Sequence, residues 1–83
     1  MQEYPIENYY RTATTALAAY LVSEGFGTPE LEFPNGTQAY FLFERSPKIE
    51  KYIAIFDTAQ AKGNIVLFFN AYQTLLRMIK ERY

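Results

Sequence analysis

Two short stretches of the chain have the residue pattern of β-strands. Residues 30–33 (ELEF) alternate strictly between polar and apolar, and residues 40–43 (YFLF) are rich in strand-forming aromatics. Between them, Pro34 presets the φ of a type I turn and Gly36 can take the positive φ that closes the loop. The pattern predicts a β-hairpin with strands at 30–33 and 37–43.

The length of the hairpin loop decides which residues face inward. We favour a three-residue loop with Phe33 opposite Thr37, because Pro34 suits a type I turn better than a paired strand position. This register leaves Tyr40 and Leu42 on the outer face, whereas a two-residue Asn35-Gly36 turn would bring them inside. The inner face in the favoured register consists of Leu31, Phe33, Ala39, Phe41 and Phe43.

A first helix is predicted over residues 12–24, where apolar residues recur at helical spacing. Thr12 is the expected N-cap residue, since its hydroxyl can accept a hydrogen bond from the first turn. Gly25 stands where a helix commonly ends in a left-handed residue, and Phe26 follows as the closing hydrophobic contact.

Two further helices follow the hairpin. One is predicted over 47–60, with Ser46 as N-cap and Pro47 at the first helical position. The other is predicted over 66–82, and its apolar residues cover more than one stripe, which indicates contacts on two sides.

The order helix, β-hairpin, helix, helix predicts an α+β fold. A single hairpin must cover its inner face, and the helices are the elements that can do so, which gives a small antiparallel sheet with helices packed on its inner face. The length of 83 residues predicts one domain, residues 1–83. Residues 1–10 are polar and Tyr-rich, and they form either a loose arm or a short extra strand.

Composition argues against an enzyme. The chain has no His and no Cys, which removes the commonest metal ligands and the usual general base and nucleophile. Glu30 and Glu32 project from one strand, where edge protection is the simpler reading than catalysis. We therefore expect no catalytic residue, no cofactor, no metal and no small-molecule substrate.

No apolar run is long enough to span a bilayer, and the N-terminus has neither the basic start nor the apolar core of a signal peptide. We therefore expect a cytoplasmic protein without membrane contact. Charge is unevenly distributed: six Glu accompany one Arg in residues 1–44, whereas seven basic accompany three acidic residues in 45–83.

Several runs resemble one known family. They are residues 10–12, 17–21 and 25–26 in the first half and 41–46 and 69–72 in the second. These runs are similar to those of a family of short bacterial, archaeal and phage proteins, known only as a domain of unknown function and often found on mobile elements. Its members commonly carry an acidic residue where this chain has Thr14 or Thr15. The resemblance implies a mobile-element context and transfers no catalytic residue.

The hypothesis is a non-enzymatic protein-binding module, in that context a regulator or inhibitor of a host system. Its apolar residues exceed what one small core needs, and aromatic residues are favoured at interfaces. The expected partner is another protein or the chain itself, as a homodimer. The candidate contact residues are Tyr40, Leu42, Ile55, Phe69, Leu76 and Tyr83.

The alternative is a nucleic-acid-binding accessory factor that uses the basic C-terminal half. Its candidate contacts are Arg77, Lys80 and Arg82, which could meet backbone phosphates. Exposed aromatics on the hairpin could also stack on bases, but the glutamates beside them oppose phosphate binding.

Overall fold

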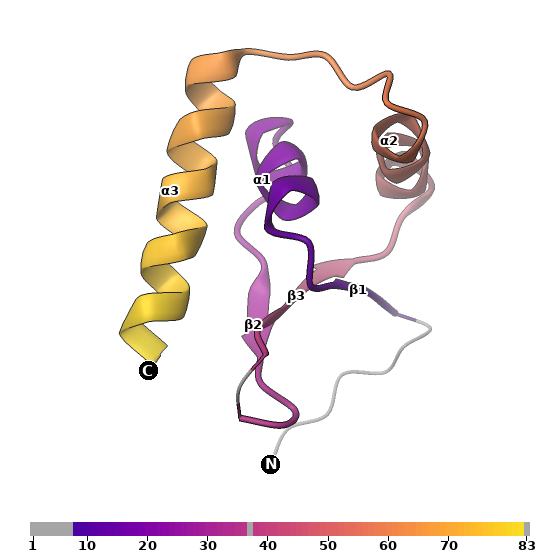
Figure 1. The fold of residues 1–83 in the computed structure, drawn as a ribbon. Helices are drawn as coiled ribbons and strands as arrows, with labels where there is room; N and C mark the ends of the chain where they lie inside the picture. Colours follow the sequence, from indigo (N-terminus) through magenta and orange to yellow (C-terminus); the bar gives the residue numbers. More distant parts are fainter. Residues whose placement is uncertain (1–7, 37, 83) are drawn as a thin grey trace.

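The structure of the protein is a computed structural model, and it describes residues 8–36 and 38–82. Helices and a small antiparallel sheet make an α+β fold, as predicted (Figure 1). The helix, hairpin, helix, helix order is confirmed, with one strand preceding it. The elements are β1 (Tyr9–Thr12), α1 (Thr15–Ser23), β2 (Glu30–Glu32), β3 (Tyr40–Glu44), α2 (Pro47–Asp57) and α3 (Ile65–Arg82).

The sheet has three strands in the order β1-β3-β2, and both pairs are antiparallel. For the last residues of the N-terminal segment, the predicted extra strand is present and not a loose arm. Strand β1 pairs with β3, with Tyr9 opposite Glu44 and Thr12 opposite Phe41. Residues 1–7 of the predicted arm lie outside the described part. Because β1 occupies one edge, β3 becomes the central strand.

The predicted turn is present, but the predicted register is wrong. The Gly36 amide donates to the Phe33 carbonyl at 3.1 Å, and Gly36 has a φ of 76°. However, Leu31 lies opposite Phe41 and not opposite Ala39. The chain does not return directly from the turn into a strand, so the pairing slips by two residues. An even slip preserves the faces, and Leu31, Ala39 and Phe41 are buried as predicted.

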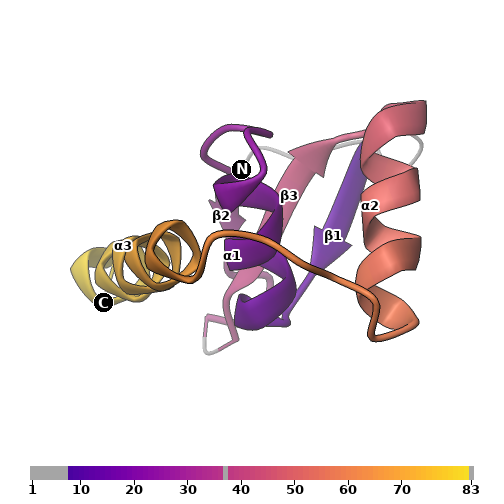
Figure 2. The same ribbon diagram turned by 90° about the horizontal axis from the view of Figure 1, so that it is seen from above.

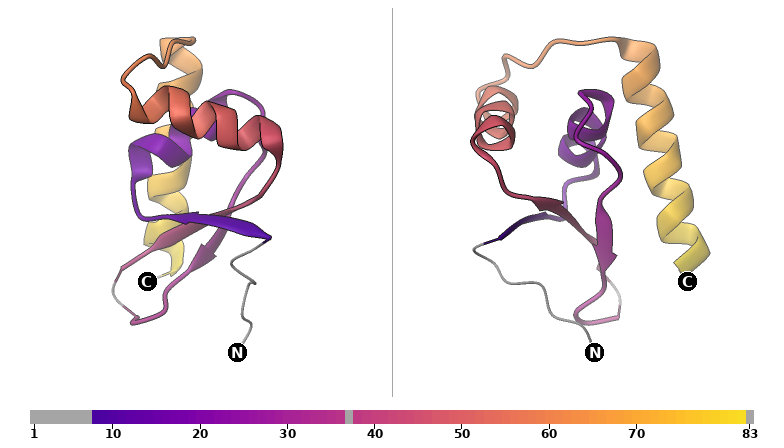
Figure 3. Two further views of the ribbon diagram at one scale, coloured as in Figure 1. Left: turned by 90° about the vertical axis from the view of Figure 1, so that its right-hand side faces the viewer. Right: turned by 180° about the vertical axis from the view of Figure 1, so that it is seen from behind.

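Two helices cover one face of the sheet, and the third stands beside them. Helices α1 and α2 lie side by side on the same face, and Figure 3 shows no helix on the opposite face among the described residues. Figure 2 shows α1 between α2 and α3, with the connection from α2 to α3 passing over α1. The principal contacts of α3 are with α1.

The core is centred on α1. Five consecutive residues of this helix, Leu17–Leu21, are buried, because the sheet and both other helices contact it. Ala18 and Ala19 are completely buried, and their small side chains let the neighbouring elements approach closely. The sheet and the other helices complete the core with Leu31, Phe41, Phe43, Ile49, Ile53, Ala71 and Leu75.

Helix α1 begins later than predicted and ends as predicted. Thr12 is not its N-cap residue, because pairing with β3 holds Thr12 in a strand, and the cap position falls at Thr14. At the other end, Gly25 has a φ of 95°, and its amide donates to the Val22 carbonyl at 3.1 Å. The amide of Phe26 donates to the Leu21 carbonyl at 3.1 Å, which completes the two-bond helix cap.

Helix α2 begins as predicted and ends three residues early. The Ser46 hydroxyl accepts from the amide of Ile49 at 3.1 Å, and Pro47 opens the helix. The helix ends at Asp57 and not near residue 60, because Ala59 takes a left-handed φ of 60°. Two backbone hydrogen bonds of 3.0 Å repeat the cap of α1 without a glycine. The amide of Ala59 donates to the Phe56 carbonyl, and the amide of Gln60 donates to the Ile55 carbonyl.

Helix α3 begins one residue before its predicted start, at Ile65. Asn64 caps it, because its Oδ1 accepts from the amides of Val66 at 2.9 Å and Leu67 at 3.0 Å. The connection from α2 therefore ends in a helix-starting residue.

The cap at Ala59 predicts a stabilising substitution. A Cβ in the left-handed region costs about 1–2 kcal/mol, part of which the greater chain entropy of glycine offsets. We expect Ala59→Gly to raise the free energy of unfolding by ~0.5–1 kcal/mol in urea titrations. The matched control is Gly25→Ala, which should lower it by a similar amount. A loss of stability in Ala59→Gly would contradict this account of the cap.

Candidate protein-interaction surface

Helix α3 is apolar on two sides, and only one side is covered. Ala71 and Leu75 are buried on the side that faces α1. On another side, Ile65, Phe69 and Leu76 are 79%, 58% and 42% exposed. These three residues are spaced by four and seven positions, so they share one face of the helix. Together with the half-buried Tyr72 and Ile79 at its border, we call this face the α3 outer stripe.

The first turn of α3 exposes two further apolar side chains, on other sides of the helix than the stripe. Val66 and Leu67 are also more than half exposed. All the large hydrophobic side chains found exposed among residues 8–36 and 38–81 belong to α3. Single exposed apolar residues are ordinary on a protein surface, but a contiguous group of them marks interaction sites.

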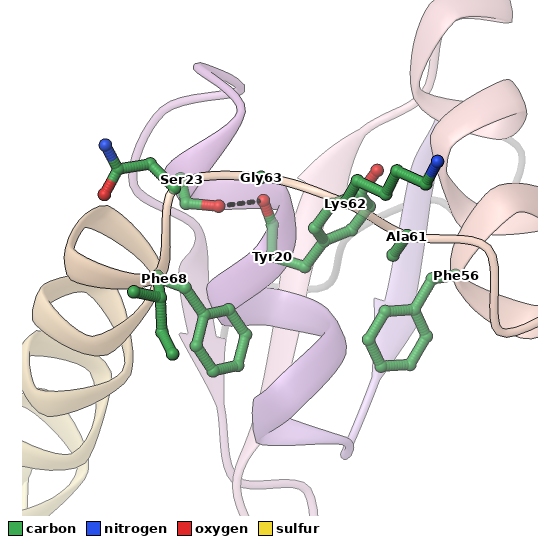
Figure 4. A pocket seen from close by; sticks show the side chains of 9 residues that line it. Tyr20, Ser23, Phe56, Ala61, Lys62, Gly63 and Phe68 are labelled. Atoms are coloured by element: carbon green, nitrogen blue, oxygen red, sulfur yellow. Dashed lines mark hydrogen bonds between the residues drawn. The ribbon is translucent and has the colours of Figure 1, made fainter.

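A cavity of about 480 Å³ opens at the N-terminal end of α3 (Figure 4). Phe68 of α3 and Phe56 of α2 line it from the two sides of α1, and Tyr20 of α1 lies between them. The connection at Lys62 and Gly63 passes over it. Ile65 also lines the cavity, so the cavity and the α3 outer stripe are continuous.

Aromatic rings join α1 to α2 beside this cavity. The Tyr20 ring centroid lies 6.1 Å from that of Tyr52 and 5.8 Å from that of Phe56. Burial raises the pKa of Tyr20 above its ordinary value, and the nearby Glu24 carboxylate and Tyr52 raise it further. The Tyr20 hydroxyl therefore stays protonated at neutral pH, and the lining carries one cation, Lys62.

Charge on α3 is confined to its C-terminal end. Residues 65–76 carry no charged side chain, whereas Arg77, Lys80 and Glu81 are exposed in the last turns. Lys80 follows Leu76 by four positions and so continues the line of the α3 outer stripe, while Glu81 points another way around the helix. The surface is therefore apolar with a cationic end. The Arg82 side chain lies outside the described part of the chain.

Of the predicted contact residues that the structure describes, Phe69 and Leu76 alone lie together on one surface. Ile55 is half-buried on α2, and α1 separates α2 from α3 (Figure 2). Tyr40 is half-buried in the sheet, with the Arg11 guanidinium carbon 6.0 Å from its ring centroid. Tyr83 lies outside the described residues.

The expectation that Leu42 is accessible on the outer face is wrong, because its side chain is 2% exposed. The hairpin alone would leave it at the margin, but β1 makes its strand central and places Arg11 opposite it, with Glu30 opposite on the other side. Arg11 also reaches across the sheet to Glu32, where its Nη2 lies 2.8 Å from a buried Oε1. This contact is an ion pair whose geometry falls short of a hydrogen bond.

Sequence reasoning missed the exposed first turn of α3 at Ile65, Val66 and Leu67. Their spacing alone cannot separate the covered side of α3 from the bare one. A usable signal was the complete lack of charge from residue 65 to residue 76, which is unusual for a helix that faces water.

Within residues 8–36 and 38–82, no three acidic side chains gather closely enough to hold a metal ion. The helices of the same residues include none whose length and apolar character would let it cross a membrane.

Fold and surface together define a small α+β protein whose last helix has an apolar, exposed outer side. The chain belongs to a family described as a domain of unknown function (DUF5659), whose model matches residues 7–82. The resemblance drawn from the sequence is confirmed at this level. Comparison with curated proteins and with solved structures gave no match in either set.

The burial of Leu42 and the exposure of Leu76 predict opposite responses to a charge. Leu42→Lys should lower the free energy of unfolding by more than ~2 kcal/mol, because it places an ammonium in a site closed to water. Leu76→Glu should change it by less than ~1 kcal/mol. Denaturant titration of both variants measures the difference, and equal losses would contradict the assigned burial.

The raised pKa of Tyr20 predicts a loss of stability in alkali. Below about pH 10 both folded and unfolded chains keep this proton, so Tyr20 contributes no pH dependence. Above that pH the unfolded chain releases it first, so stability falls as the pH rises toward the folded pKa. Tyr20→Phe should therefore show a shallower alkaline decline in urea titrations. Tyr10→Phe should also make the alkaline decline shallower, because the pKa of Tyr10 is raised as well, mainly by burial.

Proposed function

We propose that this protein is a non-enzymatic protein-binding module and that the α3 outer stripe is its contact surface. The observation that carries the proposal is the gathering of exposed large hydrophobic side chains on this one helix. Helices that present apolar residues along one face are a recurrent means of recognising other proteins.

The physical argument rests on the cost of leaving this surface in water. Removing apolar surface from water contributes ~25 cal/mol per Å², and Phe69 is the largest of the exposed hydrophobic side chains that would gain by being covered. Aromatic side chains also supply large contact areas with few rotatable bonds, which limits the entropy lost on binding. The neighbouring cavity, which Ile65 also lines, offers space for a side chain of the partner.

The mobile-element context of the resembled family extends this proposal. In that context the module acts in the cytoplasm as a regulator or inhibitor of a host system, through contact with another protein or as a homodimer. No step of chemistry is required of it, because occupying a partner's surface is sufficient for inhibition.

Nucleic-acid binding is the second candidate function. It is favoured by the exposed cations Arg77 and Lys80 at the end of α3, and Arg82 follows them in sequence. The exposed Glu30 and Glu44 on the sheet would repel phosphates, which would restrict such binding to the end of α3.

The test is affinity capture from the native host with wild type, Leu76→Glu and Thr74→Glu. Thr74 is exposed on the same helix, and two residues of separation place it about 200° around the axis from Leu76. Both variants therefore add the same charge to α3, but only one adds it to the stripe. We expect wild type and Thr74→Glu to retain a protein that Leu76→Glu loses by at least tenfold, as measured by quantitative mass spectrometry.

Nuclease treatment separates the two candidate functions. Capture that survives nuclease supports protein binding. Capture that is lost with nuclease, and that falls in Arg77→Gln and Lys80→Gln, supports the nucleic-acid alternative instead. Equal capture by all three chains would rule out the α3 outer stripe as the contact surface.

A further inference from the structure

We infer that the α3 outer stripe binds a second copy of itself, as an antiparallel helix pair with Tyr72 at the two-fold axis. This inference rests on the proposed function and names the partner of the same surface. Three properties of α3 support it: the spacing of the stripe, the position of its charges and the absence of a covering element among residues 8–36 and 38–82.

The spacing of the stripe matches the seam of a two-stranded helix pair. Ile65, Phe69, Tyr72, Leu76 and Ile79 follow one another at intervals of four, three, four and three residues. This is the heptad pattern by which apolar side chains of paired helices interlock. The three members with the greatest exposure occupy the first, second and fourth places in it, and the two half-buried members connect the seam to the core.

The same spacing is nearly symmetric about Tyr72. Phe69 precedes it by three residues and Leu76 follows it by four, so an antiparallel copy would set Phe69 against Leu76 twice. Ile65 and Ile79 lie seven residues to either side, so they would meet in the same way. Each exposed side chain of the stripe in one copy would therefore meet an apolar side chain of the other, as a two-fold interface requires.

Charge selects the antiparallel orientation. Arg77 and Lys80 lie in the C-terminal part of α3, and its first turn holds no acidic side chain. A parallel pair would bring the cations of both copies together. Along a helix ~27 Å long, an antiparallel pair about Tyr72 would separate the two Arg77 residues by ~15 Å and the two Lys80 residues by ~24 Å, beyond the ~8–10 Å over which salt screens charges.

The size of the stripe sets the strength of the pair. Half of the lateral surface of a helix ~27 Å long and ~11 Å in diameter is about 450 Å². A standard interface buries ~800 Å² per partner. We therefore expect a reversible dimer with a dissociation constant in the micromolar range and not an obligate one. The two-fold arrangement closes on itself, so association should stop at the dimer.

Sedimentation equilibrium of the whole chain, from low to high micromolar concentration, tests the existence of the dimer. Wild type should pass from monomer to dimer, and Phe69→Glu and Leu76→Glu should raise the dissociation constant at least tenfold. Thr74→Glu, which carries the same charge on the opposite side of α3, should leave it within about twofold. Circular dichroism of each variant establishes that the monomers are folded.

Disulfide trapping tests the orientation. Because the chain contains no cysteine, Phe69→Cys and Leu76→Cys each introduce a single thiol. In the antiparallel pair residue 69 meets residue 76, so oxidation should cross-link the mixture of the two variants and leave each variant alone largely uncross-linked. Efficient cross-linking of each variant alone would show a parallel pair and overturn the inference.

The remaining outcomes also decide. A wild-type chain that stays monomeric at high micromolar concentration overturns self-association but leaves binding of a foreign protein to be decided by the capture experiment. A dimer that Leu76→Glu does not weaken overturns the inference by placing the interface elsewhere. If the wild-type chain dimerises as expected but captures no host protein through the stripe, the proposal of a foreign partner is wrong and the inference of self-association stands.

Discussion

The burial of α1 is the constraint on which the other elements depend. A nine-residue helix with five consecutive buried residues, Leu17–Leu21, needs neighbours around most of its circumference. The sheet covers it from one side, and α2 and α3 cover it from two others (Figures 1 and 2). Ala18 and Ala19 permit this crowding because their side chains take little space. The sheet, α2 and α3 therefore all pack around this one helix.

This arrangement explains why α3 is left half bare. Each element that packs around the central helix α1 is covered on the side that faces α1. Since α1 is the main neighbour of α3, the opposite side of α3 is left uncovered. The connection from α2 must pass over α1 to reach the far side, and the cavity forms beneath it, where the three helices do not meet. The apolar outer side of α3 is therefore a consequence of topology together with sequence.

Two arginines show how tertiary pairing assigned roles that local patterns could not. Arg45 donates from its Nε to the Tyr9 carbonyl at 3.2 Å and pairs through Nη1 with Glu50 at 2.8 Å, so it joins β1 to the start of α2. Arg11 spans the outer sheet face toward Glu32. Both roles depend on the pairing of β1 with β3. Residues 9–12 do not alternate clearly enough between polar and apolar to predict a strand. The acidic outer face is thereby partly neutralised.

The sequence by itself determined the features that neighbouring residues enforce: the turn at Pro34, the caps at Ser46 and Gly25, and the inward face of the hairpin. Each depends on backbone preferences or on a two-residue period, which act over a few positions. Tertiary structure decided the register, the burial of Leu42 and the exposed side of α3. A two-residue slip keeps the same faces, so the pattern cannot distinguish the registers. Likewise, an apolar side chain is the same whether it meets a core or a partner, and only the packing around α1 decides which of them it meets.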